Sequence, residues 1–269
     1  MPATAEIRKF LNSLLLPRRL QISQTTEVAR LGAFFDLVKP ITTNFDLVRI
    51  GGEGDGGYLV PDDLAGIEAC FSPGVADTAD FELDFANRGV KCFLADYSVD
   101  SPPIKNDRFA FEKNYLGPTE DAVHITLENW VKRKAPDSND LILQMDIEGG
   151  EYGVLFDTGS DTLRQFRIMV IEFHNLDKLH DKSAFELINL SFRKIRKDFD
   201  VVHIHPNNCI TPFVYENYEI PPVVEFTFLR NDRISARRPT TTFPHPLDRR
   251  NVPHNADYPL PSCWHAKES

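Results

Sequence analysis

Residues 141–155, LILQMDIEGGEYGVL, place two acidic residues directly after an apolar run. Such a run is typical of a strand buried in a sheet, where an unpaired charge is costly. Asp146 and Glu148 therefore mark the point where this strand leaves the core, and Gly149 and Gly150 allow a sharp turn. We expect the two carboxylates to serve a bound ligand, or, in the simpler alternative, to cap the helix that follows.

Apolar runs of the same kind recur on both sides of this stretch, with helical patterns between most of them, for example over 180–197. This alternation predicts an α/β fold with a mainly parallel sheet covered by helices on both faces. Only a loop separates the last two runs, so one of those strands is expected to be antiparallel. The runs are IEACFS, VKCFLADY, RFAFEKNY, LILQMDI, RIMVIEF, DVVHIH and VVEFTFL.

The 269 residues are enough for one large domain with appendages. We predict a helical extension over 1–40, the main domain over 41–232 and a proline-rich tail over 233–269. The extension has an apolar helical stripe, which predicts packing on the domain or on a second copy of the chain; a membrane-surface helix is the alternative. The tail should be extended, either wrapped on the domain or loosely ordered.

The net charge of −10 disfavours a large nucleic-acid surface, which needs clustered Lys and Arg. The four cysteines show no C-x-x-C spacing and fit buried or incidental thiols in a reducing compartment. No apolar stretch reaches the length of a membrane span, and the first residues lack the pattern of a secretory signal. We expect a cytoplasmic protein that acts on a small molecule.

The loop after the first core strand, FSPGVADTADFE, begins with the small residues Ser72, Gly74 and Ala76. The next strand ends in Asp96, about twenty residues later, where an acid commonly binds a ribose. The glycines of a dinucleotide loop are missing, and Asp77 would repel a pyrophosphate. A positively charged cofactor without phosphate fits better, with Asp77 at its amino-acid end and Asp96 at its ribose. The alternative for Asp77 is an ordinary helix N-cap.

Glu172 and His174 end the next strand, two residues apart, so both side chains should point to the same side. A histidine in this position suits a general base. Together with Asp146 the two side chains could also bind a divalent cation such as Mg²⁺. A purely structural histidine is the alternative.

Two further segments are rich in polar or glycine residues. RIGGEGDGGYLVPDD, residues 49–63, predicts a lid or a glycine-rich hairpin, with Asp55 able to reach a cationic ligand. HIHPNNC, residues 203–209, follows another strand and suits hydrogen bonding to a hydroxylated substrate, or simply a turn.

The motifs SPGVADTADFE, LADYS, QMDIEGGEYGVL and VIEFH, preceded by RIGGEGDGGYLV, resemble the FkbM-type S-adenosylmethionine-dependent methyltransferases over about residues 49–230. The D-x-E-G-x-E element, here Asp146, Glu148, Gly149 and Glu151, is the most specific part. The resemblance implies a Rossmann-like class I fold of seven strands with the last antiparallel. It also implies O-methylation of a sugar or another small-molecule hydroxyl, with S-adenosylmethionine as cofactor.

We accordingly predict in-line methyl transfer with His174 as base and Asp146 and Glu172 orienting it, the substrate or a metal ion. The rivals are an NAD-dependent oxidoreductase and a non-catalytic glycan-binding or assembly protein with a degenerate pocket. The N-terminal helix is a candidate homo-oligomer contact. Predicted site residues are, for catalysis, His174, Asp146, Glu172 and Glu148; for the cofactor, Ser72, Gly74, Val75, Asp77, Asp96, Tyr97, Asp55, Gly57 and Asp146; for the substrate, His203, His205, Asn207 and Asn208; and for a metal, if one binds, Asp146, Glu172 and His174.

Overall fold

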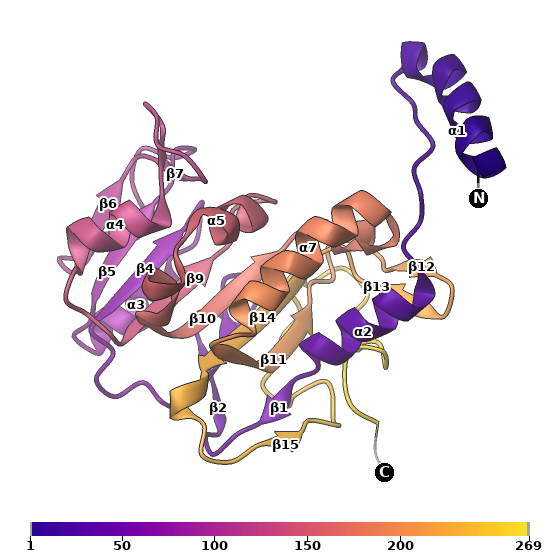
Figure 1. Cartoon of the computed structure of the whole chain (residues 1–269). Coiled ribbons are helices and arrows are strands. Elements are labelled where there is room, and N and C mark those ends of the chain that lie inside the picture. The colour runs from indigo at the N-terminus through magenta and orange to yellow at the C-terminus, as the bar shows by residue number, and fades with distance from the viewer. Residues whose placement is uncertain (1, 268–269) are drawn as a thin grey trace.

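A computed structural model of the chain describes residues 2–267. Its core is a seven-stranded sheet with the order β11-β14-β10-β9-β4-β5-β6 (Figure 1). All neighbouring strands are parallel except β14, which is antiparallel to β10 and β11. The predicted α/β fold with an antiparallel last strand is confirmed. The strands are β4 (Ala69–Pro73), β5 (Lys91–Ala95), β6 (Phe109–Glu112), β9 (Leu141–Met145), β10 (Phe166–Phe173), β11 (Phe199–Pro206) and β14 (Val224–Arg230).

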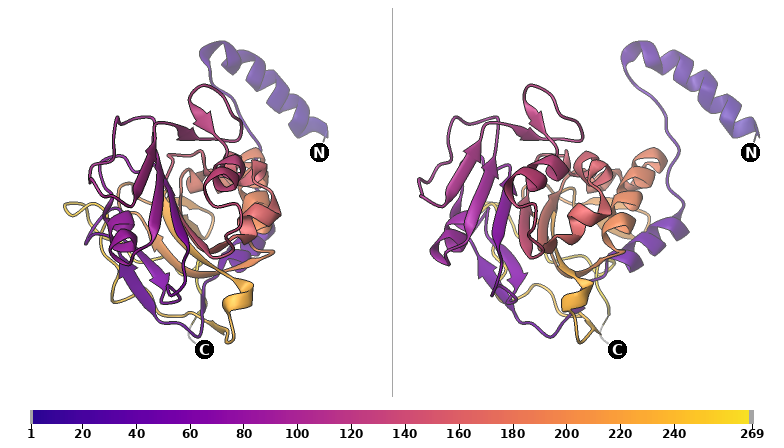
Figure 2. Two further views of the ribbon diagram at one scale, coloured as in Figure 1. Left: turned by 90° about the vertical axis from the view of Figure 1, so that its left-hand side faces the viewer. Right: turned by 60° about the vertical axis from the view of Figure 1, so that its left-hand side comes forward.

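The sheet is covered on both faces, which is why its strands are almost entirely apolar. One face packs against five helices, and the other against a helix and a β-hairpin (Figure 2). The first layer consists of α2 (Val28–Val38), α4 (Leu127–Lys134), α5 (Glu151–Asp157), α6 (Ser160–Arg164) and α7 (Lys182–Ile195). The second consists of α3 (Asp80–Asn87) and the hairpin of β2 (Leu47–Ile50) and β3 (Tyr58–Pro61).

Helix α7 shows how the sequence dictates this layer. The Asp181 carboxylate accepts hydrogen bonds from the backbone N–H groups of Ser183 and Ala184, which caps the helix start. Apolar residues then recur at helical spacing on the face toward the sheet, where Phe185, Ile188 and Phe192 are buried, whereas Leu187 and Leu190 are exposed on the other face. The prediction of a helix over 180–197 is confirmed with slightly shorter bounds.

Short elements connect and flank the core. They are β1 (Ile41–Thr42) paired with β15 (Arg238–Pro239), β7 (Tyr115–Leu116) with β8 (His124–Ile125), and β12 (Phe213–Tyr215) with β13 (Tyr218–Ile220). Three 3₁₀ segments, η1 (Leu16–Arg18), η2 (Leu176–His180) and η3 (Asn231–Arg233), complete the described chain.

The glycine-rich segment forms the predicted hairpin. Ile50 pairs with Tyr58, and residues 51–57 connect the two strands. Arg49 donates from Nε to the Gly52 carbonyl over 2.8 Å and from Nη2 to the Gly54 carbonyl over 2.9 Å. The connection is thus fastened to its own first strand.

The two ends of the chain differ in how they meet the domain. The proline-rich tail wraps around it, and the buried Trp264 packs edge-on against Phe34 and Phe35 of α2. Helix α2, which the prediction grouped with the N-terminal extension, is therefore part of the core. The wrapped form is the one of the two predicted alternatives that the structure adopts.

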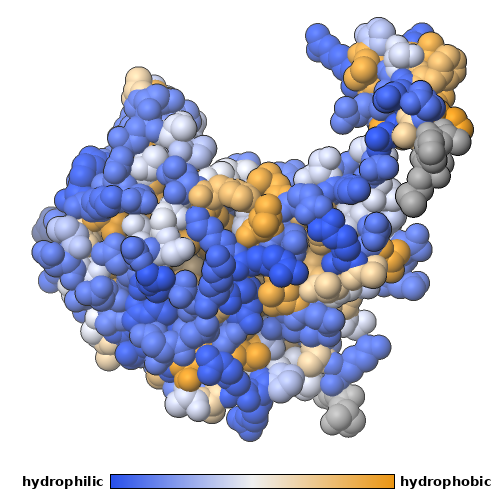
Figure 3. Space-filling view, viewed as in Figure 1, coloured by the Kyte–Doolittle hydropathy of each residue, from blue (hydrophilic) through white to orange (hydrophobic). Residues whose placement is uncertain are grey.

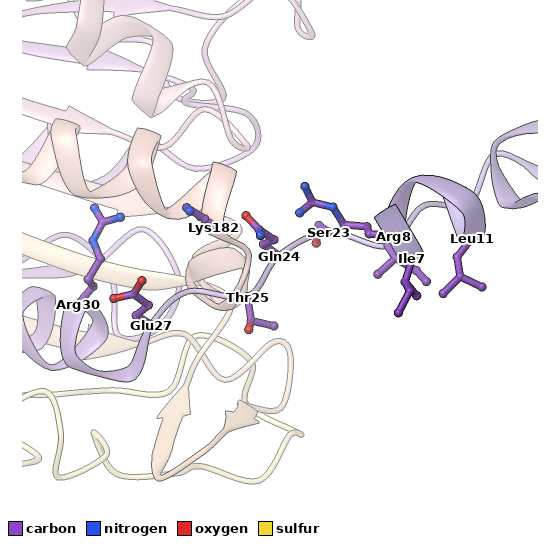
Figure 4. A pocket seen from close by; sticks show the side chains of 10 residues that line it. Ile7, Arg8, Leu11, Ser23, Gln24, Thr25, Glu27, Arg30 and Lys182 are labelled. Carbon is purple, nitrogen blue, oxygen red and sulfur yellow. The ribbon is translucent and has the colours of Figure 1, made fainter. Parts of the chain in front are cut away.

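Helix α1 (Pro2–Leu15) stands away from the sheet at the end of an extended connection (Figure 1). Its apolar residues are exposed, with Ile7 at 58% and Phe10 at 65%, and appear as orange patches in Figure 3. Figure 4 shows an open hollow between this helix and the domain, lined by Arg8 of α1, by Gln24 of the connection and by Lys182 of α7. The helix does not pack on its own domain as one alternative expected; contact with a second copy stays a prediction. Within residues 2–267, no helix combines the length and the apolar character needed to cross a membrane.

The loop after β4 meets the loop after β9 at Gly74. This glycine has φ +88°, and a Cβ built on it would lie 1.6 Å from the carbonyl oxygen of Asp146. Gly89 has a similar φ of +87°, but nothing lies within 4 Å of a Cβ there. Both positions therefore favour glycine for its backbone conformation, but only at Gly74 is there also no space for a side chain.

We expect Gly74→Ala to lower the free energy of unfolding by roughly 3–5 kcal/mol, because the loop must move away from Asp146. Gly89→Ala should cost only about 1–2 kcal/mol, the penalty of a left-handed backbone at a non-glycine residue. Urea unfolding of both variants measures the difference. Equal losses would show that the loops are not in contact.

Candidate active site

Two connected hollows lie at the carboxyl ends of the parallel strands, where α/β sheets bind ligands. The outer cleft has a volume of about 570 Å³, and the inner compartment has a volume of about 160 Å³. They share Gly74, Ala76, Asp146 and Glu148. The remaining outer lining is Ala95, Asp96, Ser98, Tyr115, Leu116, Gly117, Pro118, His124, Ile147 and Gly150. The remaining inner lining is Asp55, Gly56, Tyr58, Val75, Asp77, Thr78, Phe81, Glu82 and Gln144.

Asp96 organises the outer cleft. It is only 5% exposed; its Oδ2 accepts from the Ala76 backbone N–H over 2.9 Å and its Oδ1 from the Ser98 backbone N–H over 2.7 Å. Across the cleft, the short β7–β8 pair contributes Tyr115 and His124. The cleft therefore offers a carboxylate on one wall and aromatic rings on the other.

A chain of buried polar groups forms the floor of the inner compartment. The Ser72 hydroxyl lies within hydrogen-bonding distance of Glu82 and, at 2.6 Å, of Gln144, whose Nε2 donates to the Tyr58 hydroxyl over 3.2 Å. Ser72, which the sequence predicts as a cofactor residue, is fully buried and lines neither hollow. Its hydroxyl takes part in the buried hydrogen-bond chain below the inner compartment.

His174 lies among four carboxylates. Its Nδ1 is 3.1 Å from Glu151 Oε1, while its Nε2 is 3.4 Å from Glu148, 3.7 Å from Glu172 and 3.9 Å from Asp146. Glu151 is fully buried, and the same oxygen also accepts from the Gly149 backbone N–H over 2.9 Å. Glu151 thus fixes the histidine ring, which leaves Nε2 directed at the other three acids.

Burial raises the pKa of Asp146 to about 7, although the neighbouring charge of His174 lowers it in part. Burial also raises the pKa of Glu172 well above its usual range. For His174, burial lowers the pKa, but the hydrogen bond to Glu151 and the surrounding negative charges outweigh it, so the net pKa is raised. Asp146 Oδ1 is buried and has no hydrogen-bond partner. The site is arranged to receive positive charge.

The predicted metal set divides into two clusters. Asp146 and His174 group with Glu148, whereas Glu172 groups with Asp55 and Glu225. In each cluster, one ligand atom of every member lies within 4.8 Å of those of the others.

The four predicted substrate residues also divide. His205 Nδ1 lies 3.3 Å from Glu225, and Asn207 Nδ2 donates to Glu172 over 3.2 Å, so both face the acidic strand ends. His203 and Asn208 instead hold the tail: His203 Nε2 lies 2.9 Å from Asp248, and Asn208 exchanges hydrogen bonds with the Val252 backbone.

The other predicted cofactor residues differ in whether they line one of the two hollows. Asp77 lines the inner compartment, and it does not cap α3, whose N-cap is Ala79. Val75 and Asp55 line the same compartment.

Gly57 lines neither hollow. A Cβ at this position would lie 2.0 Å from the Gly52 carbonyl, so glycine is needed here to close the hairpin. Tyr97 packs on Tyr115 at the rim, with ring centroids 5.2 Å apart.

The sequence analysis missed Glu151 as a site residue, although the D-x-E-G-x-E element contains it. Glu82, Glu225 and Asn251 were also missed. Glu225 precedes an apolar run just as Asp146 follows one, and on an antiparallel strand the start lies at the same edge. That signal could have identified it. No local signal marks Asn251, because it comes from the tail.

A mainly parallel sheet of this order, with an acid-lined cleft at its strand ends, is consistent with a Rossmann-like methyltransferase. The family model described as Methyltransferase FkbM domain matches residues 86–199 of the chain. The match confirms the resemblance and supports a methyltransferase; it spans Asp96, Asp146, Glu172 and His174. None of the curated proteins compared with the chain matches it.

Glu82 allows a test of the buried acids. Burial raises its pKa from the usual 4.5 to about 7. Between these values the unfolded chain loses the proton that the folded protein keeps, so the stability contributed at low pH is lost as the pH rises from about 4.5 to 7. Glu82→Gln should remove that loss and be more stable than the wild type at pH 8 by roughly 1–3 kcal/mol, with little difference at pH 4.5. Urea unfolding across this pH range measures it, and parallel profiles for the two proteins would contradict the assignment.

Proposed function

We propose that the protein is an S-adenosylmethionine-dependent O-methyltransferase that acts on a hydroxyl of a sugar or a related small molecule. One observation carries the cofactor assignment. Among the described residues that line the two hollows there are five acids besides Asp96 and no Lys or Arg. Such a lining suits a ligand with positive charge and without phosphate.

The residues present fit this cofactor. The unpartnered Asp146 Oδ1 lies buried at the junction of the two hollows, where positive charge would stabilise it. Asp96 and Ser98 are suited to hydrogen-bond a ribose, and Tyr115 and His124 to contact a flat base. Asp55 and Asp77 are suited to an ammonium group. The bound cofactor would supply a methyl group on a positively charged sulfur.

The protein's own groups would then activate the acceptor. An alcohol attacks poorly until its proton is being removed, and a positioned base typically contributes about 10²–10⁴-fold. Glu151 holds Nδ1 of His174, so that Nε2 can take the proton. The charges of Glu151, Asp146 and Glu148 would stabilise the resulting imidazolium, and Glu172, 3.7 Å from Nε2, would help to orient the ring. A divalent cation held by Asp146, Glu148 and His174 is the alternative source of activation, which chelation followed by re-addition of Mg²⁺ tests.

The two rival functions would require different groups in the site. An NAD-dependent oxidoreductase has to bind a pyrophosphate, which the acids Asp55, Asp77 and Asp146 would repel. A non-catalytic glycan-binding protein would have no use for the Glu151–His174 pair.

Calorimetry with three ligands separates these functions. We expect S-adenosylmethionine and S-adenosylhomocysteine to bind and NAD not to bind. Binding of NAD alone would favour the oxidoreductase, and binding of none of the three would favour the non-catalytic protein. Transfer of a labelled methyl group to a panel of sugars and other alcohols then identifies the acceptor class.

His174→Ala should lower turnover by roughly 10²–10⁴-fold while leaving the affinity for S-adenosylhomocysteine within about threefold of the wild type. Glu151→Gln should lower turnover less, because the amide can still accept a hydrogen bond from Nδ1. The exposed His254 provides the control, since its replacement by Ala should change neither quantity. Wild-type turnover in His174→Ala would show that another group is the base.

A further inference from the structure

Two buried glutamates lie directly opposite each other on neighbouring strands. Glu172 of β10 pairs in register with Glu225 of β14, so their side chains project from the same face of the sheet. Glu172 is 4% and Glu225 is 5% exposed. Two like charges in this arrangement repel each other, and the repulsion is relieved either when one carboxylate keeps its proton or when a cation lies between them.

The neutral and basic groups around this pair leave it incompletely satisfied. Glu172 Oε1 accepts from Asn207 Nδ2 over 3.2 Å and lies 3.7 Å from His174 Nε2, but its Oε2 is buried without a partner. Glu225 accepts from Asn251 Nδ2 over 2.6 Å and lies 3.3 Å from His205. Within residues 2–267, no Lys or Arg forms an ion pair with either glutamate.

Asp55 of the hairpin connection completes a three-carboxylate cluster. One oxygen from each of Asp55, Glu172 and Glu225 lies within 4.8 Å of the other two. Oxygen ligands bound to a cation at 2.3–2.6 Å lie at most about 5 Å apart, so the spacing suits a single ion.

Asn251 is an independent indication of a ligand here. It comes from the tail, is 5% exposed, and its Nδ2 donates to Asp55 over 3.2 Å as well as to Glu225. Its Oδ1 is buried and has no partner. The amide nitrogen faces the acids in this structure, and a 180° turn of the carboxamide would present its unused oxygen, a suitable ligand for a hard cation, to an ion in their midst.

We propose that Asp55, Glu172, Glu225 and Asn251 form a binding site for a hard divalent cation such as Mg²⁺, Mn²⁺ or Ca²⁺. The burial of both glutamates favours a metal ion over an ammonium group on a larger molecule, which would need more space. The ion would join three segments that are far apart in the sequence: the hairpin connection, the sheet and the tail. This site adjoins the Asp146–Glu148–His174 cluster, because Glu172 lies 3.7 Å from His174 Nε2, but the two clusters have no ligand residue in common. Cation binding here can be measured whether or not the proposed methyl transfer takes place.

Mn²⁺ binding, followed by electron paramagnetic resonance of the free ion, tests the proposal. The wild type should bind one equivalent, and Mg²⁺ or Ca²⁺ should compete. Glu225→Gln should weaken binding by at least about 100-fold, because loss of even an outer partner of a metal ligand costs roughly 10–100-fold. Asp55→Asn should also weaken Mn²⁺ binding. Because Asp55 lies on an exposed connection, this variant should fold even if Glu225→Gln does not.

Glu148→Gln is the matched control, since it removes an acid from the other cluster and should leave Mn²⁺ affinity within about threefold of the wild type. Absence of Mn²⁺ binding to the wild type would overturn the proposal. So would binding that survives in Glu225→Gln and is lost in Glu148→Gln. Calorimetry with S-adenosylhomocysteine on the same samples keeps this outcome distinct from failure of the proposed function.

Discussion

The close approach of the Gly74 backbone to the Asp146 carbonyl is the contact on which the site depends. It joins the loop after β4 to the loop after β9, and it leaves no room for a side chain at residue 74. Asp146 is thereby placed between the outer cleft and the inner compartment, where it lines both. Gly74, Ala76, Asp146 and Glu148 form the wall that the two hollows share, and this contact holds its two loops together.

Burial of so many acids at one sheet edge is electrostatically unfavourable, and the protein reduces the repulsion by ion pairing, by hydrogen bonding and by protonation. His174 lies among four carboxylates, and Glu151 is neutralised in part by that histidine and by backbone N–H groups. Glu82 and Asp146 keep raised pKa values near 7. What remains is an excess of negative charge beside a cleft large enough for a small molecule. A positively charged ligand would relieve this excess, which is the physical reason to expect a sulfonium cofactor and, at the second cluster, a metal ion.

Much of the fold could be predicted from the sequence because each core strand is a nearly continuous apolar run. The acids at the strand ends were predictable for the same reason, since Asp146 and Glu172 interrupt apolar sequence where a core strand has to end. The roles of residues that depend on how the chain packs could not be predicted from the sequence. Ser72 and Gly57 resemble ligand-binding residues in the sequence, but in the fold Ser72 lies in the buried hydrogen-bond chain and Gly57 lies against the Gly52 carbonyl within the hairpin. Glu151 was hidden inside a recognised motif, and the position of Asn251 depends on the path of an extended tail over the domain.

A crystal structure with bound S-adenosylhomocysteine tests the central claim most directly. The account predicts the adenosine in the outer cleft, with its ribose at Asp96 and its sulfur directed toward Asp146. An adenosyl group bound elsewhere on the molecule, or a pyrophosphate ligand held against Asp77, would contradict it.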